Sequence, residues 1–338
     1  MKRTLILIIG IIISVACFAL SFRGVEAEEL KAGFLQANYF TLPLMLALLF
    51  AFYWLKAIRW KWLMSPFLPV TTRELFGPLL IGFAANNILP AHLGEFIRVF
   101  VIRRRYGAPV SAVLSTVVLE RIFDVLAILA LFGLGLAFSD DLPESYQKSA
   151  LVVGGGAVFV VFCVVIYLIW TDWFLKLVTL TCEWLPFVPK SLTEKVVGML
   201  RSGASGLSAL RSGSRVFVIA VTSLIQWFLN GLIAYVALRA FGIPVTPATG
   251  LVVTGVTAFG VTIPSTPGYF GVIQMCFQIS MRSQGNAAEI PNIESLVLGA
   301  SLYYHMSMYI PVTALGMYFL QQSGLHLKEL QKAAEKDT

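Results

Sequence analysis

The sequence predicts an all-α polytopic membrane protein. Of its 338 residues, 58% are hydrophobic and 13% are charged, with a mean hydropathy of +0.81, whereas soluble domains carry about 25% charged residues. The apolar residues form separate runs near the roughly 20 residues that cross a bilayer. We expect about six full transmembrane helices and two opposed re-entrant helical hairpins in an inverted repeat, with both termini cytoplasmic.

The first two apolar runs cover residues 5–22 and 40–58. The first is longer than the usual apolar part of a signal peptide, which favours a retained helix over cleavage after Val25-Glu26-Ala27. The second ends in aromatic and basic residues of the kind that anchor a helix at the membrane surface, namely Trp54, Lys56, Arg59, Trp60, Lys61 and Trp62.

Two later segments are interrupted in the middle. The first, 75–102, is broken by Asn86-Asn87-Ile88-Leu89-Pro90 and is followed by three consecutive arginines at 103–105. The second, 247–282, is broken by Ile263-Pro264-Ser265-Thr266-Pro267-Gly268. The other apolar runs are 112–138, 151–170, 216–241 and 293–320.

Charge counting favours re-entrant hairpins for both interrupted segments. Two hairpins place 18 of the 25 Lys and Arg residues in the cytoplasm, Lys56 and Arg59 included, and five outside. Two crossings instead give about 11 inside and 12 outside, without the cytoplasmic excess that sets topology. The same rule explains the net charge of +7, so we expect no nucleic-acid partner.

The two hairpins share a motif that suggests an inverted repeat. Pro90-x-x-x-Gly94-x-Phe96 and Pro264-x-x-x-Gly268-x-Phe270 lie 174 residues apart, and the same shift relates two flanking apolar runs. We expect one domain, 1–338, with repeats at 1–140 and 150–320 and a cytoplasmic tail at 321–338. The stretch 171–214 is read as a cytoplasmic amphipathic insertion or an ordinary connecting helix.

Three ionisable residues near the middle of the 112–138 run are the main functional signal. Glu120, Arg121 and Asp124 would each cost about 2.5–3.5 kcal/mol if unpaired at bilayer depth. Arg98 can pair with Glu120 or Asp124, and Arg121 with Glu95, giving a set of net charge −1. The set either serves a functional site or locks a hairpin to a helix.

The hairpin tips offer a second signal, because half-helices that start inside a membrane bring free N–H groups to its middle. We expect starts after Pro90 and around Pro267-Gly268, with Ser265 or Thr266 as caps. The alternative is tight turns without a ligand. Further polar residues expected at this depth are Gln226, Asn230, Gln274 and His305, and His305 is read as a hydrogen-bonded core residue rather than a proton relay.

Three motifs together resemble the lysylphosphatidylglycerol synthase transmembrane-region family, also called the flippase-like domain family. They are residues 86–98 around the first break, Glu120-Arg121-Ile122-Phe123-Asp124, and Pro264-Ser265-Thr266-Pro267-Gly268. The resemblance covers nearly the whole chain and implies handling of anionic or polyprenyl lipids in the bacterial cytoplasmic (inner) membrane. Because the chain ends at Thr338, without room for the aminoacyl-transferase domain of well-known relatives, we do not expect lipid aminoacylation. The resemblance carries the family's polar positions onto Asn87, Glu95, Arg98, Glu120, Arg121, Asp124, Pro264 and Gly268.

The sequence is therefore interpreted as a transporter or scramblase of an anionic phospholipid or polyprenyl-phosphate-type lipid, with Arg98 and Arg121 offering charge to the phosphate. The three acids would hold these arginines or take up protons. No cofactor, metal or catalytic residue is expected, and the four scattered cysteines indicate no disulfide framework. Alternatives are a membrane-embedded lipid-phosphate transferase and a scaffold for a partner glycosyltransferase or lipid synthase.

Overall fold

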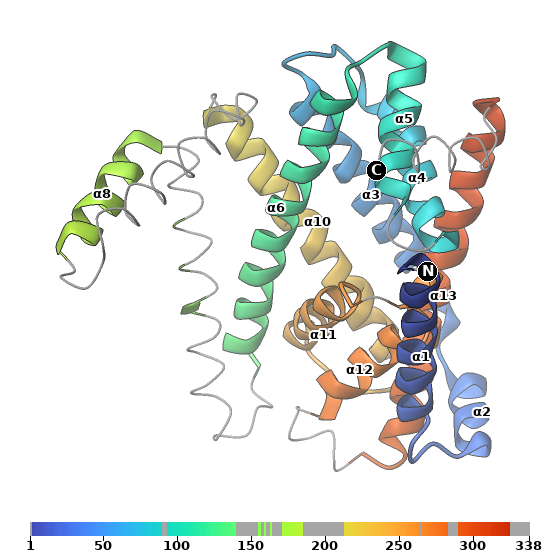
Figure 1. Cartoon of the computed structure of the whole chain (residues 1–338). Coiled ribbons are helices and arrows are strands. Elements are labelled where there is room, and N and C mark those ends of the chain that lie inside the picture. The colour runs from blue at the N-terminus through green and yellow to red at the C-terminus, as the bar shows by residue number, and fades with distance from the viewer. Residues whose placement is uncertain are drawn as a thin grey trace.

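The computed structural model contains helices and no strands in the part that it describes (Figure 1). That part comprises residues 2–89, 93–139, 155–156, 159, 163, 171–184, 213–263, 265–282 and 290–324. The fold class is therefore all-α, as predicted. Most of the 151–170 run, the 185–212 part of the predicted insertion and the tail from 325 lie outside the described residues, as do Pro90 and Pro264.

Four long helices form the frame: α3 (Leu42–Met64), α6 (Val110–Ala137), α10 (Gly213–Ala240) and α13 (Ile293–Gln322). At about 1.5 Å per residue each is longer than the roughly 30 Å hydrocarbon core. Among the described helices, Tyr39–Met64 and Gly213–Ala240 are both long and apolar enough to cross a membrane, by length and composition. The predicted count of six spans stays a prediction.

The first interrupted segment forms a helical hairpin of α4 (Thr72–Ile88) and α5 (Gly94–Tyr106). Its two helices approach so closely near the tip that a Cβ atom on Gly94 would overlap the Gly82 carbonyl oxygen. The Gly94 N–H also donates to Asn86 Oδ1 at 2.7 Å. With 17 and 13 residues, the helices reach about 25 and 20 Å, short of a full crossing.

The second interrupted segment forms a hairpin of α11 (Pro247–Gly260), the short 3₁₀ turn η3 (Pro267–Tyr269) and α12 (Val272–Arg282). Gly268 and Gly271 adopt φ values of 78° and 85°, which favour glycine. The N-terminal helix α1 (Lys2–Ser21) packs against α12 and reaches the tip, where Ser14 Oγ accepts from the Thr266 N–H at 2.8 Å.

The remaining short elements are α2 (Ala27–Gln36), the 3₁₀ turn η1 (Tyr39–Thr41) and α8 (Thr171–Trp184). Helix α2 packs against α13. The offset of 174 residues carries the bounds of α4 onto 246–262, close to α11, and those of α3 onto 216–238, inside α10. These matches support the predicted repeat, whose inverted orientation stays a prediction.

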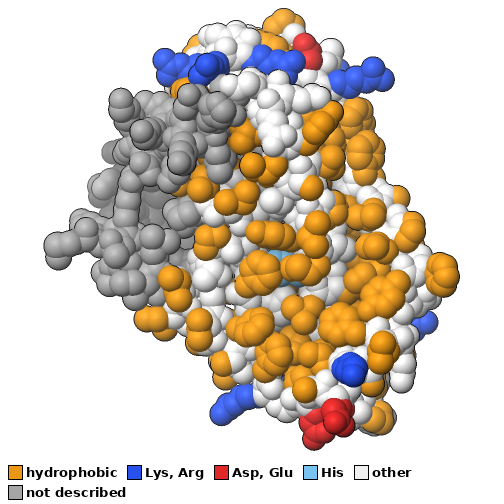
Figure 2. All heavy atoms as spheres, turned by 90° about the vertical axis from the view of Figure 1, so that its right-hand side faces the viewer, with side chains coloured by type: hydrophobic (Ala, Val, Ile, Leu, Met, Phe, Trp, Pro, Cys, Tyr) orange, Lys and Arg blue, Asp and Glu red, His pale blue; other side chains and the backbone are white. Residues whose placement is uncertain are grey.

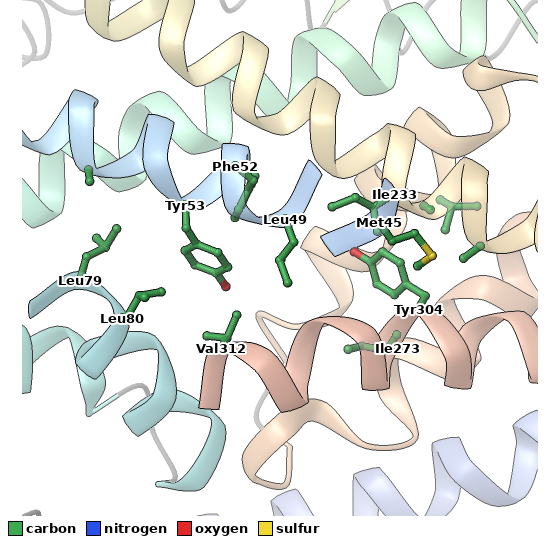
Figure 3. Packing of buried hydrophobic residues seen from close by; sticks show 14 of the residues in the cluster. Met45, Leu49, Phe52, Tyr53, Leu79, Leu80, Ile233, Ile273, Tyr304 and Val312 are labelled. Atoms are coloured by element: carbon green, nitrogen blue, oxygen red, sulfur yellow. The ribbon is translucent and has the colours of Figure 1, made fainter. Parts of the chain in front are cut away.

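One face of α3 anchors the core (Figure 3). Tyr53 lies between Leu79 and Leu80 of α4 and Val312 of α13, while Met45 lies near Tyr304 of α13. Around this core, the face in Figure 2 has a middle band of hydrophobic side chains, with charged side chains gathered at its two ends. This pattern is typical of a membrane-embedded surface.

The glycine contact in the first hairpin gives a testable prediction. Gly94→Ala should lower stability by about 1–3 kcal/mol, because the added methyl group must push α5 away from α4. Gly213→Ala is the control, since a Cβ atom there meets no atom within 4 Å. Thermal unfolding followed by circular dichroism in detergent compares the two variants. Equal midpoints would contradict the close packing of the tip.

Candidate functional site: a buried ionic network beside a cavity between two helical hairpins

Asp124 of α6 is the centre of a buried ionic network. Its carboxylate accepts hydrogen bonds from Arg59 Nη1, Gln226 Nε2 and Trp227 Nε1, each at 2.7 Å, and from Lys56 Nζ at 3.2 Å. The donors come from α3 and α10, which pack along each other. Asp124 thus joins three long helices through charge-assisted hydrogen bonds.

Glu120 lies one turn earlier on the same face of α6 and is fully buried. It accepts from Arg98 Nη1 of α5 at 2.9 Å, which is one of the predicted pairs. Its other oxygen lies 3.3 Å from Arg59 Nη2. The Arg98 guanidinium also lies over the Trp60 ring, 4.9 Å from its centroid. The first hairpin is thereby fixed to α6 and α3.

Lys56 and Arg59 correct the prediction of a basic surface anchor. Their side chains are 2% and 0% exposed, and both pair with Glu120 and Asp124. The predicted cytoplasmic count falls from 18 to 16 against five outside, so the positive-inside bias survives. The net charge of the cluster changes sign. Four cations now face three carboxylates, which gives +1 instead of −1.

Arg121 and Glu95 form the accessible part of the cluster. Arg121 Nε lies 2.8 Å from Glu95 Oε1, as predicted, and the side chains are 39% and 23% exposed. Arg121 Nη1 also lies 3.7 Å from Asp124 Oδ2. By contrast Arg98, expected to act beside Arg121, is 2% exposed and lies behind this pair.

A cavity of about 230 Å³ lies in front of the cluster, between the tips of the two hairpins. Lys56, Glu95 and Arg121 supply its charged wall. Asn87 of the first tip and Gly268 of the second also line it. Aromatic side chains make up much of the rest, namely Phe52, Tyr53, Phe83, Trp227, Tyr269, Tyr304 and Tyr309. The space therefore combines a cationic wall with an apolar one, as ligand pockets usually do.

Of the predicted residues at the second hairpin tip, Gly268 lines the cavity, whereas Ser265 and Thr266 contact helix α1. Thr266 pairs with Ser14 of α1 at 2.9 Å and makes no capping hydrogen bond to η3, so its expected capping role is wrong. Ser265 has its backbone against Gly10 of the same helix. Helix α1 thus covers this side of the tip.

The other predicted polar residues form hydrogen bonds within the protein. Asn230 lines the cavity and accepts from the Tyr304 hydroxyl at 3.1 Å. Gln274 Nε2 lies 3.2 Å from His305 Nδ1, and its oxygen accepts from the Gly271 N–H at 2.8 Å. His305 is 3% exposed, which fits the reading of a hydrogen-bonded core histidine. Asn87 Nδ2 donates to Thr313 at 2.9 Å.

Sequence reasoning missed Lys56, Arg59 and Trp227 as members of the site. A usable signal was present, because Lys56 and Arg59 are three residues apart and share a helix face inside a run of apolar residues. Cations one turn from the expected membrane surface resemble an interface anchor, however. Lys56 and Arg59 lie in the interior because α6 and α10 pack over them, and this packing is a property of the tertiary structure.

The helical fold, with its buried cluster of charged side chains, is consistent with a helical membrane protein. The chain belongs to the family described as the lysylphosphatidylglycerol synthase TM region, which matches residues 7–316. It is similar to a protein named glycosyltransferase AglD from Haloferax volcanii, with 25% identity over 336 residues, covering 90% of this chain and 52% of AglD. The chain thus spans about half the length of that relative.

A second relative is similar over nearly its whole length. It is a protein named UPF0104 membrane protein MJ1078 from Methanocaldococcus jannaschii, with 21% identity over 249 residues, covering 72% of this chain and 96% of the relative. No solved structure matches the chain.

The network predicts unequal costs for its two kinds of carboxylate. Asp124→Asn should destabilise the protein by about 3–5 kcal/mol, because it leaves Lys56 and Arg59 buried beside a neutral partner. Glu95→Gln should cost about 1 kcal/mol or less, since its pair is partly exposed. Unfolding in mixed micelles measures both free energies. Similar losses for the two variants would contradict the buried-hub assignment.

Proposed function

We propose that the protein moves an amphipathic anionic lipid, a phospholipid or a polyprenyl-phosphate-type lipid, across the bacterial cytoplasmic membrane. The head group passes through the cavity between the hairpin tips while the apolar tail remains in the bilayer. Both hairpins re-enter from opposite faces as an inverted repeat, and both termini lie in the cytoplasm. Half-helices that meet near the midplane are the usual placement of a transporter's binding site.

The observation that carries this proposal is the net charge of +1 behind the cavity. Buried charges are stable when they are paired, yet the cluster has one cation more than it has carboxylates. Lys56 and Arg121 line the cavity beside Asn87. A phosphate in the cavity would balance the surplus charge and take hydrogen bonds from these side chains.

The buried residues of the cluster have a structural role, and the partly exposed ones contact the ligand. Asp124 and Glu120 are 2% and 0% exposed and are surrounded by donors, so they hold the helices together. Arg98 acts with them. Arg121 and Glu95 face the cavity. An incoming phosphate replaces the Glu95 carboxylate as the partner of the Arg121 guanidinium, and the carboxylate returns when the phosphate leaves. Exchange of similar partners allows the anion both to enter and to leave.

An enzymatic role is the second candidate, because the relative AglD is named a glycosyltransferase. A transferase acting on a lipid-linked phosphate would use the same anionic substrate class. A scaffold for a partner glycosyltransferase or lipid synthase would also fit membership in this family. The three candidate functions predict different activities for the purified chain without a partner protein.

Translocation in liposomes tests the proposal. Arg121→Gln should slow transfer of a fluorescent phosphatidylglycerol between leaflets by about tenfold or more, since one charge-assisted hydrogen bond is worth about 1.5–3 kcal/mol. Arg239→Gln is the matched control, because Arg239 is exposed at the end of α10. Equal rates for folded Arg121→Gln and wild type would overturn the role of Arg121.

The same liposomes separate the alternatives. With a radiolabelled lipid phosphate and a sugar donor, a transferase converts the lipid, whereas a transporter returns it unchanged in the other leaflet. A scaffold shows neither activity until its partner is added. Product formation without translocation would reject the proposed function.

A further inference from the structure

A second cavity, of about 480 Å³, lies on the outer side of the first hairpin. It is bounded by α4, α5 and the last turns of α13, and it shares no lining residue with the cavity between the hairpin tips. Its volume falls within the roughly 300–1,000 Å³ of ligand pockets. We call it the hairpin groove.

The walls of the hairpin groove are apolar. Pro78 and Ile81 of α4, Val101 of α5 and Phe319 of α13 line it. Gly77 is part of the same wall, and a Cβ atom there would meet the Phe319 ring at 3.3 Å. The small residue at this position of α4 lets the Phe319 ring lie close against the helix.

The rim of the hairpin groove is cationic. Arg104 and Arg105 line it from the last turn of α5. Both are exposed, and among the described residues no carboxylate lies within ion-pair distance of either. Gln322 and Ser323 add polar groups at the end of α13. Figure 2 shows charged side chains gathered beyond the hydrophobic band at both ends of its face.

We propose that the hairpin groove binds an anionic phospholipid, with its phosphate at Arg104 and Arg105 and an acyl chain along Pro78, Ile81, Val101 and Phe319. Basic pockets between membrane helices, at head-group level, attract anionic head groups. The apolar wall below the arginines excludes a free phosphate as the main occupant, because inorganic phosphate would leave that surface uncovered. The site is separate from the proposed transport cavity.

Photo-cross-linking tests the hairpin groove directly. The full-length protein is reconstituted in phosphatidylcholine bilayers with a phosphatidylglycerol probe that carries a diazirine in its acyl chain. We expect cross-links on α4, α5 and α13 at the lining residues. The double variant Arg104→Gln/Arg105→Gln should reduce their yield about thirtyfold, as expected from two arginines near the membrane surface.

Three controls make the result decisive. Arg103→Gln should leave the yield unchanged, because Arg103 is exposed on the same turn but is not among the lining residues. A zwitterionic phosphatidylcholine probe should give a low yield, and excess inorganic phosphate should not compete. Equal loss with Arg103→Gln, equal labelling by the zwitterionic probe or full competition by phosphate would each overturn the proposal.

The outcome does not depend on the proposed transport. Arg121→Gln should leave cross-linking in the hairpin groove unchanged, whereas the double variant reduces it without altering the residues that line the cavity between the hairpin tips. Failure of the groove proposal therefore leaves the translocation result standing, and the reverse also holds.

Discussion

The need to neutralise two carboxylates inside an apolar helix constrains the rest of the structure. Asp124 and Glu120 lie on one face of α6, where water cannot solvate them, and breaking a buried pair costs about 3–5 kcal/mol. Their partners come from α3, α5 and α10. One short stretch of α6 therefore fixes the positions of α3 and α10 and, through α5, of the first hairpin.

This arrangement explains how irregular backbone is tolerated at the centre of the molecule. A break in a helix leaves backbone groups without helical partners, and inside a membrane each unsatisfied group costs several kcal/mol. At the first tip Asn86 accepts from Gly94, and at the second Ser14 and Gln274 accept from Thr266 and Gly271. Side chains thus take over the role of water, and both tips border one polar cavity.

The sequence was sufficient to predict the helical class, the two interrupted helix pairs and the pair Arg121–Glu95, with Arg98–Glu120 as one of the two pairings open to Arg98. Re-entry of the two helix pairs from opposite membrane faces stays a prediction. These features follow from local patterns, namely hydropathy, Pro and Gly breaks, and charges at helical spacing. It was insufficient to predict that Lys56 and Arg59 turn inward, because a basic residue near a helix end fits a membrane surface equally well. That choice depends on which helices pack beside α3, and a linear pattern does not contain it.

The two inward cations change the sign of the net charge of the site. A cluster with a surplus carboxylate, as the charge of −1 expected from the sequence implied, would repel a phosphate or would have to take up a proton. With Lys56 and Arg59 included, the surplus is positive, and Lys56 and Arg121 carry it to the cavity wall. Because ion pairing is strong at low dielectric, a change in the sign of the net charge changes the sign of the ligand that such a cluster attracts. In the proposed function this surplus favours an anion, and the aromatic wall beside it favours one attached to an apolar body.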